Sequence, residues 1–488
     1  MPPHDCDLVI IGSGFGGAVC ALRAAQAGLR VLTLERGRRM TPAAFDALSA
    51  GEQPAFHGQD QPGLIEFHRC SGLVAVSASA VGGGSVLYTA VTLPAPPEVF
   101  ASGWPRGLDA DTLATYYDRV ARMISPTPLL HSLPRTTALE ELGTRIGASA
   151  TRLPLSMNWP DEPSKLDRRP PANGVFSELA AWIRGGHAAR KRTLAETYLL
   201  QAEAAGAAIR PLHEVTAIIP AADGYEIRYR SFRDGQWSEG LVAAPRVILA
   251  AGALGTTRLL LHCRDAIKTL PNLSHALGTR FHTNGDFGAL LVEPQPALTL
   301  DAGPPVTAWL DFWPTRRLFV METGLIPYDT GSLTGLLNPA KWLRGLRLTP
   351  AKHCIWSFGI MGLEANPGEL RLTRRGKLIH RRDSRRSEDY RRRMMTTLAE
   401  LAAAANAKLL TPPALIARLL PVTVHPLGGA PMADSPDHGV VNSYGEAFGH
   451  PGLYVADAAI VPTPTAVPPS MTVAALAERI ADHLFRGL

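Results

Sequence analysis

Short runs of branched apolar residues set the pattern of this chain, and each run ends at a glycine or an acidic residue. Residues 8–11 form the first run, whose unbroken apolar character is typical of a parallel strand buried on both faces. Small and apolar residues over 18–27 predict a helix that ends at Gly28. A second apolar run over residues 29–34 predicts another strand. This order of strand, helix and strand predicts the beginning of a parallel α/β sheet.

The glycines between the two strands have the spacing G-x-G-x-x-G, at Gly12, Gly14 and Gly17. Glycines in such a turn let the backbone approach a pyrophosphate, and the helix N-terminus binds its negative charge. Glu35, at the end of the second strand, is placed to accept hydrogen bonds from a ribose. The motif therefore predicts a dinucleotide site. Its residues are Gly12, Ser13, Gly14, Phe15, Gly16, Gly17, Glu35, Arg36 and Gly37.

Three consecutive glycines, Gly82 to Gly84, lie in an apolar stretch further along the chain. Glycine loses more backbone entropy on folding than any other residue, so three in a row do not favour a helix or a strand. They suit a position where the backbone contacts a flat or charged ligand. A flexible surface loop is the alternative interpretation, and the apolar flanks argue against it.

The middle of the chain alternates polar and apolar positions more regularly. Strand-like pieces between residues 208 and 242, separated by turn signals, predict a β-meander. Residues 246–252 again have the pattern of a buried strand that ends in glycine. We expect this strand to lie beside the first one in the same parallel sheet.

Three other segments have clear local patterns. Residues 40–61 are rich in Pro, Gly and Ala and predict a loop. An amphipathic pattern over residues 108–123 predicts a helix, with Asp109 or Asp111 as its N-cap. Residues 387–409 predict a second helix, and we interpret its arginine-rich first half as a solvated face.

The C-terminal segment contains the strongest candidate for catalysis. His425 follows an apolar strand and precedes the glycine pair Gly428–Gly429, where a ligand can approach the backbone closely. A strand over residues 453–456 then ends at Asp457, which predicts a second phosphate- or ribityl-facing turn. A lone histidine is more often structural, but these neighbours favour a ligand site.

Together, these motifs resemble those of the glucose–methanol–choline (GMC) oxidoreductases, and most of all those of the bacterial cholesterol oxidase-like FAD enzymes. The resemblance extends over the whole chain, in family order. The matching segments are residues 12–17 with Glu35, 82–85, 250–255, 270–273 ahead of Asn284-Gly285, 425–429 and 453–458.

The resemblance implies FAD as cofactor and an α/β fold with two parts. One is a three-layer, Rossmann-like FAD-binding domain, and the other is a discontinuous α+β substrate-binding domain. The FAD-binding domain is expected over residues 1–94, 190–282 and 415–488, and the substrate-binding domain over 95–189 and 283–414.

Further cofactor contacts follow from the resemblance. The glycine-rich segment implies contacts with the flavin, and later residues imply contacts with the adenine, the ADP moiety and the pyrophosphate or ribityl chain. No metal site is implied. The implied FAD-binding residues are Val81, Gly82, Gly83, Gly84, Ser85, Tyr88, Val215, Ala251, Gly252, Asp457, Ala458, Pro468, Pro469 and Ser470.

The family activity transfers a hydride from an alcohol carbon to flavin N5 while a base takes the hydroxyl proton. His425 matches the family's active-site histidine, and a neutral imidazole suits the role of base or alcohol-orienting group. The expected substrate is therefore a hydroxyl of an apolar small molecule, such as a steroid, terpenoid or long-chain alcohol. The expected acceptor is oxygen or another oxidant. Some relatives bind FAD covalently through a histidine, for which His57 and His68 are open candidates.

Two departures from the family pattern keep other functions open. Pro468 stands where an Asn or a second His is usual, and its side chain has no hydrogen-bonding group. Tyr88 stands where cholesterol oxidases have Asn, although its phenol offers a donor of its own. The first alternative is therefore a flavin-dependent isomerase, lyase or biosynthetic tailoring enzyme. The second, suggested by a basic amphipathic segment around Trp342, is a flavin-binding protein with a structural role at a membrane surface.

Composition and charge narrow the class of protein. The chain has 488 residues, of which 46% are hydrophobic and 19% charged, as in globular proteins with more than one core. Its net charge of +6 comes with no nucleic-acid-binding motif, so no nucleic-acid partner is expected. The five cysteines lack the spacing of a zinc site or of a disulfide framework.

The expected location is the cytoplasm. The first strand begins too early for a signal peptide, and no run of 18 apolar residues predicts a transmembrane helix. Residues 336–348, however, have the pattern of a short basic amphipathic helix around Trp342. That segment suggests peripheral membrane contact or a cap over a substrate entrance; an ordinary packed helix is the alternative.

Overall fold

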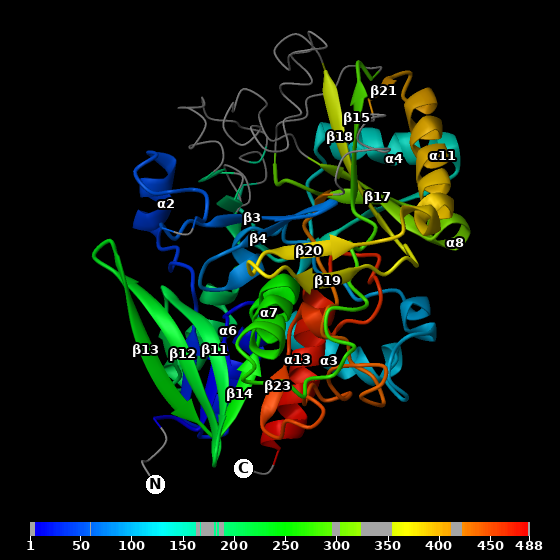
Figure 1. Cartoon of the computed structure of the whole chain (residues 1–488). Coiled ribbons are helices and arrows are strands. Elements are labelled where there is room, and N and C mark those ends of the chain that lie inside the picture. The colour runs from blue at the N-terminus through cyan, green and yellow to red at the C-terminus, as the bar shows by residue number, and fades with distance from the viewer. Residues whose placement is uncertain are drawn as a thin grey trace.

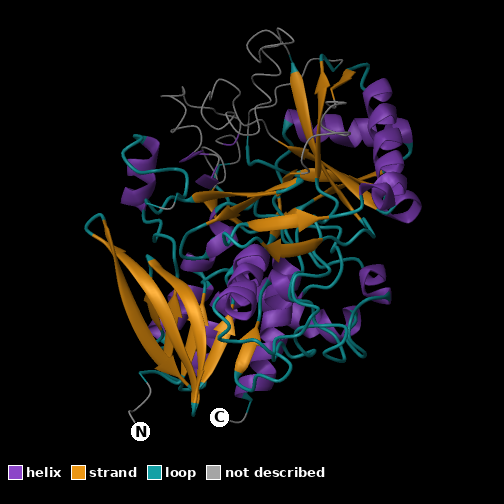
Figure 2. Cartoon of the chain, in the orientation of Figure 1, coloured by secondary structure: helices purple, strands orange, loops and turns teal. Residues whose placement is uncertain are grey.

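The chain folds into two layered regions with a narrow band of strands between them (Figures 1 and 2). One region contains both described termini and a parallel sheet; the other contains a larger sheet covered by two helices. The computed structural model describes residues 5–58, 60–162, 166, 180–181, 183–184, 190–294, 303–323, 354–410 and 422–486.

The parallel sheet has the strand order β10-β2-β1-β14-β23, and all its described pairings are parallel. Every residue of the central strand β1 is buried, which explains its unbroken apolar sequence. The predicted partnership with the later buried strand is confirmed, because Val9 is in register with Val247. The strands are β1 (Leu8–Ile11), β2 (Val31–Leu34), β10 (Ala208–Arg210), β14 (Arg246–Leu249) and β23 (Leu453–Val455).

Helices made largely of small residues pack together beside this sheet. Helix α1 (Phe15–Gln26) contacts both α13 (Ser470–Phe485) and α6 (Tyr198–Ala204), and α13 also contacts α3 (Ala110–Ile124). The predicted cap of α3 is confirmed, because the Asp109 side chain accepts a hydrogen bond from the Thr112 N–H.

An antiparallel meander lies at the edge of this region, as predicted (Figure 1). It consists of β11 (His213–Ala221), β12 (Gly224–Arg233) and β13 (Gln236–Ala244). Its first strand begins soon after β10, so the meander brings Val215 close to the end of β2.

The second region contains a six-stranded sheet of antiparallel pairs with the order β21-β15-β18-β17-β16-β6. Side chains alternate between its two faces. On β17, Leu318 and Val320 pack with the helices α4 and α11, whereas Phe319 and Met321 belong to the core shared with the parallel sheet. The elements are α4 (Pro134–Ile146), β6 (Ser149–Arg152), β15 (Phe287–Val292), β16 (Ala308–Asp311), β17 (Leu318–Thr323), β18 (Ile355–Gly362), α11 (Glu388–Ala404) and β21 (Lys408–Leu410).

Two small β-structures lie between these regions (Figure 1). The first joins the hairpin β3 (Ile65–Cys70) and β4 (Leu73–Ala78) to β22 (Val422–Thr423), which runs parallel to β4. The second is a hairpin, formed by β19 (Glu369–Leu372) and β20 (Leu378–Arg381). Strand β22 ends two residues before the catalytic candidate His425. The first of these β-structures therefore fixes the position of that side chain.

Three local predictions need correction or fall outside the described residues. Residues 40–61 are not all loop, because Thr41 caps a helix, α2 (Pro42–Ser49), that begins with proline. The predicted second helix ends at Ala404 instead of residue 409, and the chain continues into β21. The amphipathic segment around Trp342 lies outside the described residues. Within the part of the chain that the structure describes, no helix is long and apolar enough to cross a membrane.

The two large sheets draw their strands from different parts of the chain. All five strands of the parallel sheet fall in the segments expected for FAD binding, and all six of the antiparallel sheet fall in those expected for substrate binding. We therefore propose that these sheets are the centres of the two expected domains.

A buried ion pair locks the helices next to the glycine motif. The Glu478 carboxylate of α13 has no exposed surface and accepts hydrogen bonds from Arg23 Nε at 2.8 Å and from the Tyr198 hydroxyl at 2.8 Å. Replacing Glu478 by Ala leaves the Arg23 cation partly buried without its partner. We expect Glu478→Ala to lower the free energy of unfolding by about 3–5 kcal/mol in urea titrations.

The matched control is Glu203→Ala, which breaks an ion pair of similar geometry at the surface. Its Arg39–Glu203 distance is 2.6 Å, but both side chains are about one-third exposed. We expect a loss of no more than about 1 kcal/mol. Equal losses in the two variants would show that burial does not set the strength of the Glu478 network.

Candidate functional site

A cavity of about 1720 Å³ extends between the two regions and collects most of the predicted site residues. Pockets for one drug-sized ligand are typically about 300–1,000 Å³, so this cavity has room for a dinucleotide and a second molecule. The predicted residues that line it are Gly12, Gly14, Phe15, Gly16, Glu35, Arg36, Gly83, Gly84, Tyr88, Val215, Ala251, Gly252, His425, Asp457, Ala458, Pro468, Pro469 and Ser470.

The other predicted residues lie behind this lining and hold it in place. Ser13 donates its hydroxyl to Glu35 at 2.7 Å and accepts the Gly82 N–H at 3.1 Å, which joins the two glycine-rich turns. Gly37 donates its N–H to the other Glu35 oxygen at 2.8 Å. These bonds fix the carboxylate at the cavity wall, where it still has lone pairs for a ribose. The residues of this supporting layer are Ser13, Gly17, Gly37, Val81, Gly82 and Ser85.

The two glycine-rich turns, residues 12–17 and 82–85, form a cradle at the cavity wall. The packing of their backbone shows whether a dinucleotide fits there. A Cβ on Gly16 would lie 1.7 Å from the Ala456 oxygen, and one on Gly83 would lie 2.6 Å from the Gly14 Cα. A Cβ on Gly14 would meet only the Gly83 Cα, at 3.9 Å, on the cavity side. The protein itself therefore explains why positions 16 and 83 are glycine, whereas the open space at Gly14 fits a bound pyrophosphate.

Asp457 connects the end of β23 with helix α7 (Gly252–Leu261). Its carboxylate accepts the N–H groups of Gly252 and Ala459, each at 2.8 Å, and the hydroxyl of Thr256. Burial raises the pKa of Asp457 to about 6 despite these donors. The side chain therefore orders the turn that faces the expected pyrophosphate or ribityl chain.

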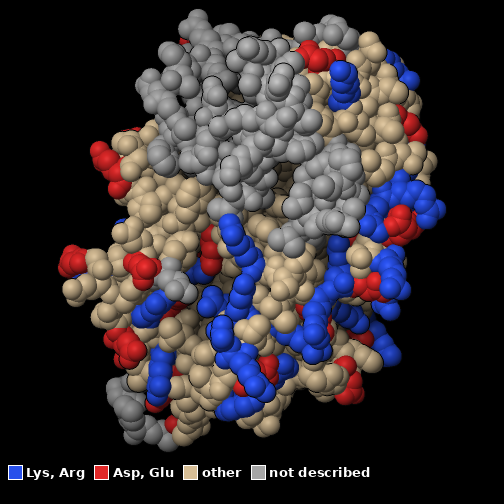
Figure 3. Space-filling view, turned by 45° about the horizontal axis from the view of Figure 1, so that its top comes forward, with Lys and Arg blue, Asp and Glu red and all other residues tan. Residues whose placement is uncertain are grey.

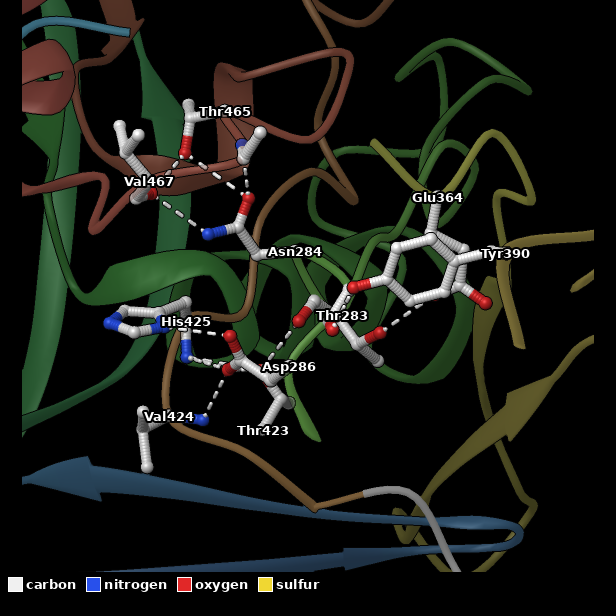
Figure 4. A network of polar contacts seen from close by, with 12 residues as sticks. Thr283, Asn284, Asp286, Glu364, Tyr390, Thr423, Val424, His425, Thr465 and Val467 are labelled. Carbon is white, nitrogen blue, oxygen red and sulfur yellow. Dashed lines mark hydrogen bonds and ion pairs between the residues drawn. The ribbon is translucent and has the colours of Figure 1, made fainter. Parts of the chain in front are cut away.

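The catalytic candidate His425 is bound to an acidic side chain that the sequence analysis missed. Its Nδ1 lies 2.9 Å from Asp286 Oδ1 (Figure 4). The other oxygen of Asp286 accepts the backbone N–H groups of Val424 and His425 at 3.0 and 3.1 Å, and the Thr423 hydroxyl at 2.8 Å. The imidazole is 20% exposed and lines the cavity.

Backbone pairing brings these two side chains together from positions 139 residues apart. The His282 N–H donates to the Leu427 oxygen at 2.8 Å, and the Leu427 N–H donates to the His282 oxygen at 3.1 Å. Gly428 has φ of +79°, and a Cβ there would lie 1.8 Å from the Arg280 oxygen. The Asn284-Gly285 motif was a signal for this segment, but nothing in the sequence indicated which later residue Asp286 contacts.

Asn284 controls the loop that presents Pro468 to the cavity. Its side-chain amide donates to the Val467 oxygen at 2.9 Å, and its oxygen accepts the Ala466 N–H at 2.9 Å (Figure 4). Both Asn284 and Ala466 have positive φ, at +58° and +61°. This buried clamp holds a strained turn beside the expected flavin, and the sequence analysis did not assign it.

Tyr88 does not present its hydroxyl to the cavity as expected. The ring lines the cavity, but the hydroxyl donates to the Arg192 backbone oxygen at 2.7 Å, and burial raises the pKa of Tyr88 well above its ordinary value. Beside it, Lys191 is buried and donates to the oxygens of Val86 at 3.0 Å and Tyr88 at 2.6 Å. Burial lowers the pKa of Lys191 to about 7.

Of the two histidines considered for covalent attachment, only His68 lines the cavity. Its Nε2 lies 2.8 Å from the Ser77 hydroxyl oxygen, and burial lowers its pKa to about 4. His57 instead places its Nδ1 3.2 Å from the Gly63 oxygen.

The part of the cavity formed by the second region is lined mainly by apolar residues, together with several arginines. Lys and Arg side chains gather on the face shown in Figure 3, and Arg391, from the region interpreted as solvated, lines the cavity. Arg382 is bound to Glu364, and Arg391 to Glu388. Apolar residues that line this part are Phe287, Leu290, Val306, Met321, Phe358, Ile360, Met361 and Met394.

Comparison with known families identifies two matches. Residues 7–303, more than half of the chain, match the family described as FAD dependent oxidoreductase. Residues 368–477 match the family described as GMC oxidoreductase. The first match covers the glycine motif and the meander, and the second covers His425 and Asp457.

Individual relatives agree with these family matches. The chain is 28% identical to a cholesterol oxidase of Mycobacterium tuberculosis, over 98% of this chain and 91% of that protein. It is 25% identical to a cholesterol oxidase of Acinetobacter baumannii, over 99% and 94%. A long-chain-alcohol oxidase of Arabidopsis thaliana is 34% identical over 110 residues, which cover 21% of this chain and 13% of that protein.

A solved structure has the same fold. The crystal structure of pyridoxine 4-oxidase from Mesorbium loti superposes with a TM-score of 0.70, covering 98% of this chain and 99% of that one, at 18% sequence identity. The predicted α/β fold is confirmed at the level of architecture, whereas the two expected domains stay a prediction.

The different surroundings of two glycines predict different effects of adding one methyl group. We expect Gly14→Ala to keep the stability of the FAD-free protein within about 0.5 kcal/mol of the parent but to weaken FAD binding about tenfold or more. Gly16→Ala should instead destabilise the FAD-free protein by about 1–3 kcal/mol, because its Cβ collides with backbone. FAD titration and thermal unfolding of both FAD-free variants check this. Unchanged FAD affinity in Gly14→Ala would contradict the pyrophosphate assignment.

His282, next to the paired segment, predicts a loss of stability in acid. It is buried, its Nε2 lies 3.2 Å from the Pro462 oxygen, and burial lowers its pKa to about 4. Because the unfolded chain protonates this group near pH 6.5, its contribution is present above that pH and is lost as the pH falls toward 4. The loss is at most about 3 kcal/mol.

We expect the melting temperature to fall between pH 6.5 and 4, and to fall less steeply in His282→Gln. The control is His275→Gln, which replaces an exposed histidine and should keep the parent's slope. Parallel slopes in the parent and His282→Gln would show that this imidazole does not cause the acid sensitivity.

Proposed function

Because this chain belongs to the GMC family of FAD-dependent oxidoreductases, which act on CH–OH groups, we propose that it oxidises a hydroxyl of an apolar small molecule. Steroids, terpenoids and long-chain alcohols are the proposed substrate classes. The observation that carries this proposal is the position of His425, at the border between the dinucleotide cradle and an apolar chamber. Oxygen or another acceptor is proposed to reoxidise the flavin.

The residues that hold FAD in this proposal are those of the cavity lining. The first glycine turn and Asp457 bind the pyrophosphate and ribityl chain, Glu35 binds the adenosine ribose, and Val215 contacts the adenine. When bound, FAD supplies the acceptor for the hydride. In the segment from Gly82 to Ser85, Gly83 and Gly84 line the cavity and would contact the flavin, with Gly82 and Ser85 behind them.

His425 performs the acid–base part of the proposed reaction. Its Nδ1 is engaged by Asp286, so Nε2 is the nitrogen available to a hydroxyl in the cavity. A neutral imidazole at this position accepts the hydroxyl proton while the alcohol carbon releases its hydride. Pro468 brings no side-chain donor or acceptor to the site, so it supplies shape and excludes water.

The apolar chamber determines the proposed substrate class. Among the described residues, its walls come from β15, β17, β18 and α11, and most of this lining is apolar. Two polar groups on the wall, Thr323 and Ser357, are bound to each other with their hydroxyl oxygens 2.6 Å apart. The names of the cholesterol oxidases and the long-chain-alcohol oxidase support the same class.

Anaerobic mixing of the FAD-loaded protein with hydroxysteroids, terpene alcohols and long-chain alcohols tests the proposal. We expect one class to bleach the visible flavin band and to give a product lighter by two hydrogens. In His425→Ala the rate constant of bleaching should fall about 10²–10⁴-fold. His438→Ala, at an exposed histidine, is the control and should match the parent.

The product mass separates oxidation from the alternative chemistry. A flavin that stays oxidised with every class, together with products of unchanged mass, would replace the proposal by a flavin-dependent isomerase or lyase. Bleaching that persists in His425→Ala at nearly the parent's rate would keep the oxidoreductase and remove His425 as its base.

Peripheral membrane contact around Trp342 is a separate proposal, and co-sedimentation with liposomes tests it.

A further inference from the structure

We propose that Asp286 is a positioning residue that fixes the tautomer of His425 and thereby lets this single imidazole perform the proton transfer without a polar partner at position 468. The inference rests on the proposed function for its consequence in catalysis. Its structural content, the protonation of Nδ1 and the free lone pair on Nε2, is independent of any substrate.

The hydrogen bonds around Asp286 determine the direction of its bond to His425. Asp286 Oδ2 accepts from three donors, namely the Val424 and His425 N–H groups and the Thr423 hydroxyl. A carboxylate with this many donors is bound as an acceptor only. Oδ1 therefore also accepts, and the proton between it and His425 belongs to Nδ1. The lone pair of the neutral imidazole is consequently on Nε2.

The backbone around Asp286 is held so that this geometry is preserved. Gly285 has φ of +69°, and its oxygen accepts the Tyr390 hydroxyl at 2.6 Å. The Asn284 side chain is bound to the loop before Pro468, and the Thr283 hydroxyl donates to Glu364 at 3.1 Å (Figure 4). Asp286 is thus fixed by the contacts of the three residues that precede it, and its side chain is only 9% exposed.

Asp286 gives His425 the polar contact that the side chain of Pro468 cannot make. When Nε2 accepts the hydroxyl proton, the ring becomes an imidazolium whose Nδ1–H faces a carboxylate at 2.9 Å. Because the imidazole is only 20% exposed and the carboxylate 9%, such a contact stabilises the cation more than it would in solvent. His425 can then orient the alcohol and take its proton alone, although position 468 holds an apolar proline ring.

The decisive variant is Asp286→Asn, which keeps the size of the side chain. Its amide group can donate to Nδ1, which favours the tautomer with a proton on Nε2 and leaves no acceptor for the alcohol. We expect the rate constant of anaerobic flavin bleaching to fall about 10²–10⁴-fold, with FAD content unchanged. Asp286→Glu should recover part of that loss. Thr423→Val removes one donor but keeps the Nδ1 contact, so it should cost less than tenfold.

The tautomer is measured directly in the FAD-loaded protein labelled with ¹⁵N-histidine. Long-range ¹H–¹⁵N correlation spectra distinguish the two ring nitrogens, and the His425 signals are those missing from His425→Gln. We expect Nδ1 to be protonated in the parent and Nε2 in Asp286→Asn. A merely structural role of Asp286 would not change the tautomer.

Each outcome decides the inference. A parent protein with its proton on Nε2 would overturn it, even if Asp286→Asn fails to fold. Bleaching within a few-fold of the parent's rate in a folded, FAD-loaded Asp286→Asn would overturn it as well. Failure of every alcohol to bleach the flavin would overturn the proposed function instead, because the tautomer measurement needs no substrate.

Discussion

One backbone pairing holds the candidate site together, namely that of residues 278–282 with residues 427–429. It includes the pair of hydrogen bonds between His282 and Leu427, and on the other side the Gly428 N–H donates to the Ala458 oxygen at 2.8 Å. The segment that carries His425 is therefore bound both to the Asp286 segment and to the turn that carries Asp457. In the proposed function, proton transfer and cofactor binding therefore depend on the same backbone segment.

The cofactor cradle shows how much of a binding site is made by close backbone approach. The first glycine turn contacts the second one and the end of β23 at distances that no Cβ allows. Side chains then act mainly from behind, as when Ser13 joins both turns and fixes Glu35. An arrangement of this kind costs backbone entropy at each glycine, and the surrounding packed helices, locked by the buried Glu478, offset that cost.

The proposed substrate side, in contrast, is made mainly by side chains instead of by close backbone approach. Alternation is clear on β17, where Leu318 and Val320 pack toward α4 and α11, whereas Met321 and Thr323 line the cavity. Most of the described lining on this side is apolar, which is the reason we propose an apolar substrate. The polar chemistry is concentrated at one point, where His425 meets Asp286 and Asn284 fixes the loop of Pro468.

The sequence by itself determined the elements whose signals are local. Unbroken apolar runs predicted β1 and β14 and their pairing, the glycine spacing predicted the cradle, and turn signals predicted the meander. It also singled out His425, because glycines and apolar residues around it are close in the chain. The Thr41–Pro42 start of α2 was a local signal too, although it was outweighed by the Pro and Gly content of its neighbourhood.

Only the tertiary structure decided which distant groups meet. Asp286 and His425 are 139 residues apart, and the Tyr88 hydroxyl binds a backbone oxygen 104 residues away instead of facing the cavity. Such partners depend on how two sheets and their connecting strands pack, and a hydrogen bond between remote residues leaves no periodicity in either segment. The sequence therefore indicated a histidine as candidate base, whereas the fold determined which carboxylate contacts it.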